Sequence, residues 1–486
     1  MASIKKLLTL IGLGNLMFGV CHAEDITIRY NGSQAKVTQT KKDSVSVTID
    51  GATVNIESLY EGHKLTLLLK GSSDNGHLIL KTLGKAKVTL DNLNLTSQEG
   101  APLHLKNKKK LEVVAAKGTE NTLAITACND TANHKAATIW AKDKLLLSGK
   151  GTLNIIATGD GCRGIKSKKD ITIEDITLNV TTSGDNLGEK PFGPPDGFPG
   201  GPDGGFEMPK MPEMPKGDFP MPGDSTKRFG PPGFPDGMPP MGDMPPEGGG
   251  FGGKHKYVSS TKGIASKGKI TVNSGNVIVR TSTAGAEGIE GKEGVIFNGG
   301  NVDVLATDDA VNAGACIEFN GANVTARSTG NDAVDSNPSS GFFSPFGSNE
   351  QSDEPAIVIR GGTVYAWSQV GSPEEGLDCD FAALVVEGGK VFSVGGGMGE
   401  MPSVPTSETV QQPTVLLIGI GIVKDEPICI YNDNGKLLDT VTIPFSLRRS
   451  ASLVSCPAFK LGSTYTVKTK EYERSFTFEE NFITVR

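Results

Sequence analysis

The chain is poor in the residues that usually build metal clusters and aromatic cores. Its 486 residues include two tryptophans, six histidines and seven cysteines, and aromatic residues make up 6% of the total. No two cysteines have the CxxC spacing, and no cysteine–histidine spacing suits zinc, so the sequence offers no zinc module. What the chain has in abundance is glycine, with 63 residues, which is typical of a turn-rich β protein.

Only one long apolar run is present, and it lies at the N-terminus. Lys5 and Lys6 precede an apolar stretch from Leu7 to Val20, and residues 1–23 have the pattern of a secretory signal peptide with cleavage after Ala23. No later stretch is long and apolar enough to span a membrane. We therefore expect a secreted or cell-surface protein. Lipid attachment at Cys21 is less favoured, because Val20 stands where a small residue is expected.

The balance of charge excludes one class of partner. The full chain has a net charge of −7, and loss of the signal with its two lysines makes it two units more negative. An acidic chain of this kind argues against a nucleic-acid partner. It would also repel an acidic polymer unless a metal ion lay between them.

No segment has the period of an amphipathic helix, and composition divides the chain. Residues 24–186 alternate short β-rich runs with turns. Residues 187–256 hold 17 of the 28 prolines, which predicts a disordered insertion, because proline cannot donate to a β-ladder. Residues 257–400 resume the β-rich pattern, 401–413 form a linker, and 414–486 predict a small antiparallel β cap or domain.

Six cysteines remain after signal removal. They are Cys128, Cys162, Cys316, Cys379, Cys429 and Cys456. An even number in an exported chain permits disulfides, and buried thiols are an equally good interpretation.

A four-residue acidic motif recurs in the second half of the chain. Its copies are 287–290 (EGIE), 309–312 (DAVN), 332–335 (DAVD) and 375–378 (EGLD), and their aliphatic members follow one another at steps of 22, 23 and 43 residues. A repeat of this length predicts coils that stack on one another. The expected fold is all-β, a right-handed parallel β-helix. One interior row should contain Ile139, Ile165, Ile264, Ile289, Val311, Val334 and Leu377.

Stacking would bring the acidic residues of the motif into rows. Equivalent positions in neighbouring coils lie roughly 4.8 Å apart, where carboxylates repel one another unless a cation separates them. Calcium prefers six to eight oxygen ligands. The candidate ligands are Glu287, Glu290, Asp308, Asp309, Asn312, Asp332, Asp335, Glu375 and Asp378. The alternative is that these side chains only cap turns by hydrogen-bonding backbone amides.

Several segments resemble a family of secreted bacterial proteins that carry a carbohydrate-binding β-helix domain. They are 26–30 with 47–52, 118–123, the acidic motif, and 455–465. A clostridial member of that family binds polygalacturonic acid and calcium. The resemblance therefore implies a non-catalytic protein that binds an acidic polysaccharide with the help of calcium. This chain departs from the family pattern at Arg163, Lys166 and Lys262, which confines an ion row to the later coils.

Two other functions stay open. A calcium-dependent polysaccharide lyase would need a base beside the metal, and Arg280, Arg327 and Arg360 are the candidates. A calcium-rigidified surface adhesin would bind the ion but no glycan. Trp140, Tyr365 and Trp367 are the aromatic residues in the repeat region, too few for a neutral-sugar platform, which favours recognition by charge.

Overall fold

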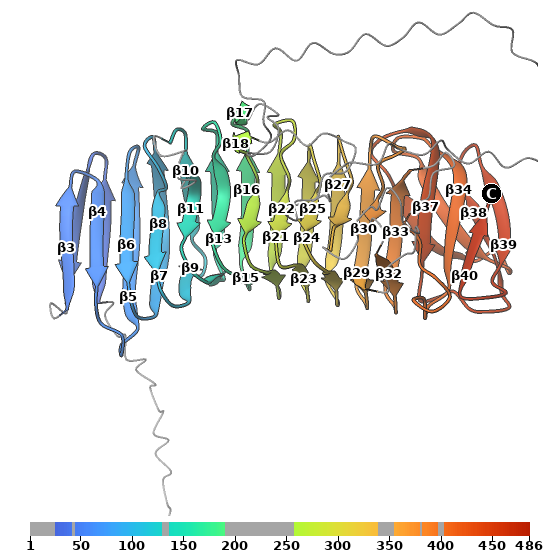
Figure 1. Cartoon of the computed structure of the whole chain (residues 1–486), viewed down its shortest axis with the longest axis horizontal. Coiled ribbons are helices and arrows are strands. Elements are labelled where there is room, and N and C mark those ends of the chain that lie inside the picture. Colours follow the sequence, from blue (N-terminus) through green and yellow to red (C-terminus); the bar gives the residue numbers. More distant parts are fainter. Residues whose placement is uncertain are drawn as a thin grey trace, which may run out of the picture. The chain divides into compact units, whose positions relative to one another are not determined.

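The protein is built from β-strands. The computed structural model describes residues 25–40, 44–128, 136–189, 257–338, 354–379, 382–396 and 403–486, and every regular element in these ranges is a strand. Most strands pair in parallel with the strand of the next coil (Figure 1). In these ranges no helix is long and apolar enough to cross a membrane.

One sheet has 11 strands, and each of them comes from a different pass of the chain. Its strands, in order, are β3 (Val45–Asp50), β4 (Thr53–Ser58), β6 (His77–Thr82), β8 (Leu103–Asn107), β11 (Ala137–Ala141), β14 (Arg163–Ser167), β19 (Ile264–Ser266), β22 (Ile289–Gly291), β25 (Val311–Ala313), β28 (Val334–Ser336) and β31 (Leu377–Asp378). We call it the motif sheet, because all four acidic motifs end in its strands.

A second sheet of 23 strands receives two strands from most coils. The first strand of each pair belongs to the row β9 (Leu111–Ala115), β12 (Leu145–Gly149), β15 (Ile171–Glu174), β20 (Ile270–Val272), β23 (Val295–Phe297), β26 (Ile317–Phe319), β29 (Pro355–Ile359) and β32 (Ala383–Val386). The second belongs to the row β10 (Glu120–Ile125), β13 (Thr152–Ala157), β16 (Thr177–Thr182), β21 (Asn276–Thr281), β24 (Asn301–Ala306), β27 (Asn323–Ser328), β30 (Thr363–Ser368) and β33 (Lys390–Gly395). The long strands β5 (Leu65–Ser73) and β7 (Ala86–Ser97) take both places in the earliest coils.

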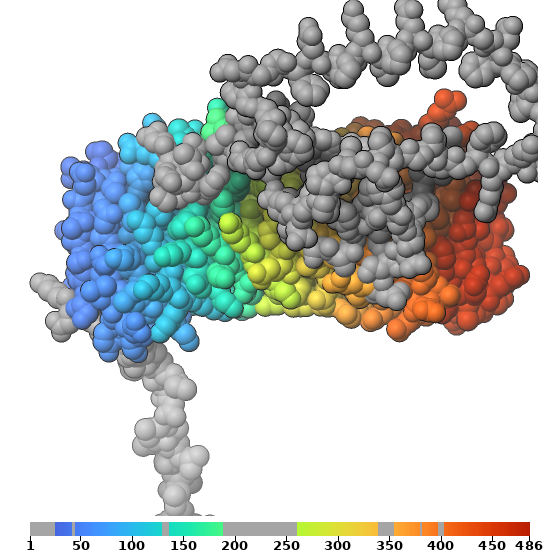
Figure 2. All heavy atoms as spheres, in the orientation of Figure 1, coloured from blue at the N-terminus to red at the C-terminus, as the bar shows by residue number. Residues whose placement is uncertain are grey.

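The predicted interior row is confirmed. Register pairs Ile139 with Ile165, then Ile264, Ile289, Val311, Val334 and Leu377 in succession. All seven are at most 2% exposed and belong to one continuous core. Aromatic side chains also stack between equivalent positions of neighbouring coils. The rings of Phe297 in β23 and Phe319 in β26 lie 5.2 Å apart. No coil encloses a core alone, so the fold depends on the stack. In Figure 2 the colours succeed one another along the long axis, so segments that follow in the sequence also lie next to one another in the stack.

Both ends of the stack depart from parallel pairing. At the start, β1 (Ile26–Asn31) pairs antiparallel with β2 (Gln34–Gln39), and β3 pairs antiparallel with β4. At the other end β34 (Thr414–Ile422) and β37 (Leu447–Ser455) pair antiparallel, and β40 (Phe482–Val485) joins β34. A separate antiparallel sheet contains β36 (Leu437–Thr442), β35 (Pro427–Asn432), β38 (Thr464–Lys468) and β39 (Glu473–Thr477). Such hairpins protect the open edges that a stack would otherwise expose.

The chain divides into two compact units. The first contains residues up to Gly188 and from Val258 onward, and the second is Glu189–Tyr257. The strands β17 (Leu187–Glu189) and β18 (Tyr257–Ser259) form a two-stranded sheet of their own. Apart from these strands, the predicted insertion 187–256 lies outside the described residues.

Close approach of coils explains one of the motif's small residues. A Cβ atom built on Gly288 would lie 2.5 Å from the carbonyl oxygen of Ala310 and 2.4 Å from Val304 Cγ1. Real Cβ atoms are not found at such distances, so glycine is needed here to let neighbouring coils meet.

Candidate functional site

The acidic motifs form two parallel rows at the motif sheet. In what we call the face row, register places Lys166, Ala265, Glu290, Asn312, Asp335 and Asp378 side by side. In what we call the turn row, three residues earlier in each motif, the backbone follows Arg163, Lys262, Glu287, Asp309, Asp332 and Glu375. The sequence therefore predicted correctly which residues the fold brings together. Three different chemical environments occur along these rows, and we call them steps. The first lies around Glu287 and Glu290, the second around Asp309 and Asp335, and the third around Asp332 and Glu375.

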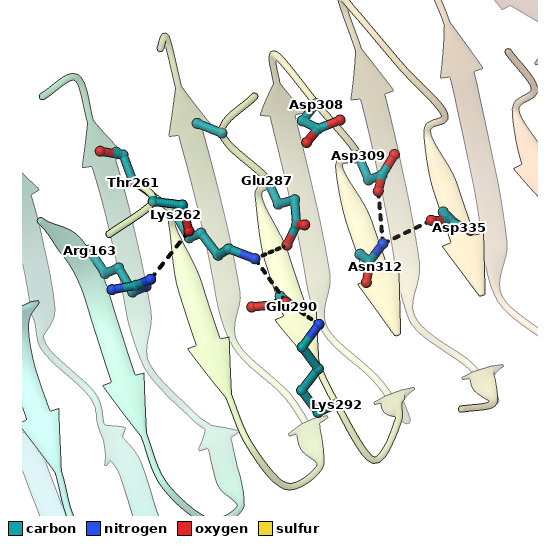
Figure 3. Close-up of polar contacts among 12 residues, drawn as sticks. Arg163, Thr261, Lys262, Glu287, Glu290, Lys292, Asp308, Asp309, Asn312 and Asp335 are labelled. Atoms are coloured by element: carbon teal, nitrogen blue, oxygen red, sulfur yellow. Dashed lines mark hydrogen bonds and ion pairs between the residues drawn. The ribbon is translucent and has the colours of Figure 1, made fainter. Parts of the chain in front are cut away.

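At the first step, the cation comes from the chain itself. Lys262 Nζ lies 2.7 Å from Glu287 Oε2 and 2.8 Å from Glu290 Oε1, and Lys292 Nζ lies 2.6 Å from Glu290 (Figure 3). Burial raises the pKa of Glu290, but the two ammonium groups outweigh it and bring that pKa down to about 2. The pKa of Lys262 is raised in turn, because its two carboxylate partners outweigh burial. Glu287 and Glu290, both predicted calcium ligands, are therefore already neutralised by lysine.

At the second step, side-chain amides separate the carboxylates. Asn312 Nδ2 donates to Asp309 Oδ2 and to Asp335 Oδ2, each at 2.8 Å (Figure 3). Asn331 Nδ2 donates to Asp308 Oδ1 at 2.9 Å and to Asp309 Oδ1 at 2.7 Å. Asn337 Nδ2 lies 2.7 Å from both oxygens of Asp335. Asn331 and Asn337 escaped the sequence prediction because neither belongs to the four-residue motif.

The third step is the most strongly acidic. Asp332 is 7% exposed and accepts a hydrogen bond from the backbone N–H of Glu375. Burial, together with the negative charge of Asp378 and Asp309, raises the pKa of Asp332 to about 9. Among the described residues, no lysine or arginine forms an ion pair with Asp332. An added cation would therefore gain most at this step.

A residue from outside the motifs, Ser403, donates hydrogen bonds to two acids of the third step. The backbone N–H of Ser403 donates to Glu375 Oε2 at 2.6 Å, and its hydroxyl donates to Asp378 Oδ1 at 3.1 Å. A pocket of about 20 Å³ lies beside Glu375, lined also by Ser393 and Ser403. This volume has room for about one water-sized occupant. Ser403 lies in the predicted linker 401–413, so no periodicity pointed to it.

The donor set at the second and third steps suits calcium chemically, since it consists of carboxylate and amide oxygens. Within the described ranges, no three His, Cys, Asp or Glu side chains already converge on one metal position. Several of the oxygens instead accept the hydrogen bonds given above. Both interpretations of the motif thus find support in the same residues: the acids accept hydrogen bonds from N–H groups, and they place several carboxylates near buried Asp332.

The arginines considered for lyase chemistry lie elsewhere. Arg280 in β21 and Arg327 in β27 both contact Asp303, at 2.5 and 3.0 Å. Arg360, which follows β29, contacts Glu318 at 2.6 Å. Arg280 and Arg327 belong to the 23-stranded sheet and Arg360 directly follows one of its strands, whereas the acidic rows lie at the motif sheet.

The aromatic and cysteine residues have mainly structural surroundings. Trp140 is 4% exposed and packs against Ala101 and Ala137. Trp367 is 5% exposed and donates from Nε1 to the carbonyl of Phe392. Among the described residues, the cysteines Cys128, Cys162, Cys316, Cys379, Cys429 and Cys456 form no disulfide with one another.

Comparison with known proteins supports a relation to carbohydrate binding. Residues 50–190 and 251–336, just under half of the chain, match the sequence model of a family described as carbohydrate-binding domain-containing protein. A protein of the same description from Acetivibrio thermocellus is 25% identical over 163 residues, which are 32% of this chain and 54% of that protein. The match thus spans about half the length of this relative.

A solved structure, that of the polysaccharide lyase-like protein from C. thermocellum as a gadolinium derivative, is also similar in part. It is 17% identical, with a TM-score of 0.40 over 63% of this chain and 92% of that chain.

Proposed function

We propose that the mature chain is a secreted or cell-surface right-handed parallel β-helix that binds an acidic polysaccharide, such as polygalacturonate, with the help of calcium and without cleaving it. The observation that carries this proposal is buried Asp332, which lies near other acids and forms no ion pair with a lysine or arginine of the described residues. Burial, and after it the negative charge of Asp378 and Asp309, raises the pKa of Asp332 to about 9, so its carboxyl keeps its proton well above the usual range. A divalent ion would offset these effects.

The oxygens that would hold calcium belong to Asp309, Asp332, Asp335, Glu375 and Asp378, with Asp308 and Asn312 beside them. A bound calcium ion would supply positive charge to these buried carboxylates and leave coordination positions for a uronate carboxylate. Glu287 and Glu290 are less suited to this role, since Lys262 already lies between them. The proposal therefore centres on the coils from β25 to β31.

Binding without cleavage is supported by two observations. The sequence model matched by this chain is that of a carbohydrate-binding domain. In addition, Arg280 and Arg327 lie in the other sheet, Arg360 directly follows a strand of it, and the three form ion pairs with Asp303 and Glu318. None of them lies beside the carboxylates that would hold the ion, where a lyase needs its base.

The test uses the pair of substitutions Asp309→Ala and Asp332→Ala. In the wild-type protein, saturating calcium at 100 times its Kd should add about 2.7 kcal/mol to the free energy of unfolding. The double variant should lose this increment and also lose the calcium-dependent part of its retention in a polygalacturonate affinity gel, because both depend on the same oxygens. A matched control is Asp74→Ala with Asp433→Ala, two exposed acids outside the rows.

Each alternative has its own outcome. Retention that is undiminished by chelator and by the double substitution would overturn the calcium mechanism. Release of unsaturated oligosaccharides during the assay would establish the lyase instead. Stabilisation by calcium without retention of any acidic or neutral polysaccharide would indicate the adhesin.

A further inference from the structure

Six lysines from six successive coils lie one above another at the end of the motif-sheet strands. We call Lys81, Lys106, Lys142, Lys168, Lys267 and Lys292 the lysine ladder. Register pairs Lys81 with Lys106 directly. The others follow by backbone hydrogen bonds, from Lys142 N to Leu105 O, Lys168 N to Ala141 O, Lys267 N to Ser167 O and Lys292 N to Ser266 O. All six side chains are exposed.

The middle of this ladder has no acidic partner. At its ends, Lys81 Nζ lies 2.5 Å from Glu57 and Lys292 Nζ lies 2.6 Å from Glu290. Lys106, Lys142, Lys168 and Lys267 form no ion pair with any residue in the described ranges. A nearby acid, Asp170, is bound to Lys144 at 2.9 Å instead.

Two further groups beside the ladder, an ammonium and an indole N–H, lack a partner of the kind that an anion could provide. Lys166, in the face row, has no ion pair within the described part of the chain. Burial and the positive charges of Arg163 and Lys267 lower its pKa to about 7. The ammonium of Lys168 lies 5.7 Å from the centre of the Trp140 ring. The indole N–H of Trp140 has no acceptor among the described residues.

The usual structural reasons for surface lysines do not account for this row. Lysines protect sheet edges, but β8, β11, β14 and β19 are paired on both sides. Like charges stacked at the strand spacing of roughly 4.8 Å destabilise one another. The ladder ends in the coil where the acidic rows begin. In the next coil, the position equivalent to Lys292 is occupied by Gly314.

We propose that the lysine ladder is a second, metal-independent subsite, which binds the carboxylates of an acidic polysaccharide running along the stack of coils. This inference rests on the proposed function and extends it to a different part of the same sheet. Five steps at the strand spacing give a track of roughly 24 Å, long enough for several charged units. The early coils would thus contact the polymer directly, and the later coils would contact it through calcium.

The experiment measures binding of polygalacturonate at low salt in the presence of EDTA. The ladder variant carries Lys106→Gln, Lys142→Gln, Lys168→Gln and Lys267→Gln. The matched control carries the same change at Lys36, Lys117, Lys150 and Lys436, which are exposed lysines away from the ladder. We expect the ladder variant to lose about tenfold or more in affinity and to lose most of its salt dependence, while the control changes little.

Calcium-dependent stabilisation, which the ladder variant should keep, verifies that it folds. The ladder proposal is wrong if the wild-type protein and the ladder variant bind polygalacturonate equally tightly in EDTA. It is also wrong if the wild-type protein does not bind polygalacturonate in EDTA at all. Calcium-dependent retention that persists in that case would leave the proposed function standing. Failure to retain polygalacturonate with or without calcium would overturn both. Tighter binding of polyphosphate or duplex DNA than of polygalacturonate would overturn the assignment to a uronate polymer.

Discussion

At the scale of single residues, the motif sheet uses three ways to place carboxylates close together. Lys262 supplies a covalently attached cation to Glu287 and Glu290, and Asn312 supplies amide hydrogens to Asp309 and Asp335. Asp332 has no lysine partner and accepts one backbone N–H, from Glu375, and its raised pKa keeps it protonated. A buried lysine held by two carboxylates resists exchange with solvent ions, since removal of one partner leaves a buried charge. The first step is therefore fixed in charge, while the third responds to pH and to cations.

This difference predicts how stability depends on pH. The folded protein keeps a proton on Asp332 up to about pH 9, whereas the unfolded chain releases it near the usual value of 3.8. Between these values the folded state binds more protons, so the free energy of unfolding should fall as the pH rises. Urea titrations in EDTA from pH 5 to 9 should show this fall, and Asp332→Asn should flatten it.

The control for this prediction is Asp433→Asn, at an exposed acid, which should leave the slope unchanged. Calcium should also flatten the wild-type slope, because the ion replaces the proton. A wild-type stability that rises steadily over this range would contradict the assigned charge state of Asp332.

At the scale of the strand, the repeat spacing was sufficient to predict which residues share a row. The aliphatic member of each motif points inward, so every error of one residue would have turned the row outward. The spacing could not predict the partners of the polar side chains. Whether Lys262 reaches Glu287, or Ser403 reaches Glu375, depends on side-chain length and on segments outside the repeat. The ladder lysines follow one another at steps of 25, 36, 26, 99 and 25 residues, which is no regular period, so only register identifies the six as neighbours.

The interior row gives the element-scale prediction. Val311→Asp would bury a carboxylate between Ile289 and Val334, and no described side chain of opposite charge lies in that row. Such a change should cost several kcal/mol, on the order of 3–5, because the charge is buried without a partner. Denaturant unfolding measures this loss. The matched control is Ile278→Asp in β21, where the side chain is 38% exposed and the cost should stay below about 1 kcal/mol.

At the scale of the whole molecule, charge is sorted along the stack. Basic residues of the ladder occupy the coils from β6 to β22, and the acidic rows occupy those from β22 to β31. A net charge of −7 therefore conceals a basic row of exposed side chains and acidic rows whose members are mostly buried. Net charge alone led to the expectation that an acidic polymer needs a metal bridge, because composition carries no information about position. Sorting of this kind would orient a bound polymer along the axis of the stack.

Chain continuity gives the last prediction. The coils before and after residues 190–256 pair directly, since β14 pairs with β19, β15 with β20 and β16 with β21. The stack is therefore complete without the intervening segment, and surface insertions of great length cost little, because closure entropy grows slowly with length. Replacing 190–256 by a short Gly/Ser linker between β17 and β18 should change the free energy of unfolding by about 1 kcal/mol or less. Calcium-dependent retention of polygalacturonate should persist in this variant, because every proposed ligand lies outside the deleted residues. Loss of the cooperative transition would mean that the segment contributes to the stack itself, and loss of retention alone would place part of the glycan site within it.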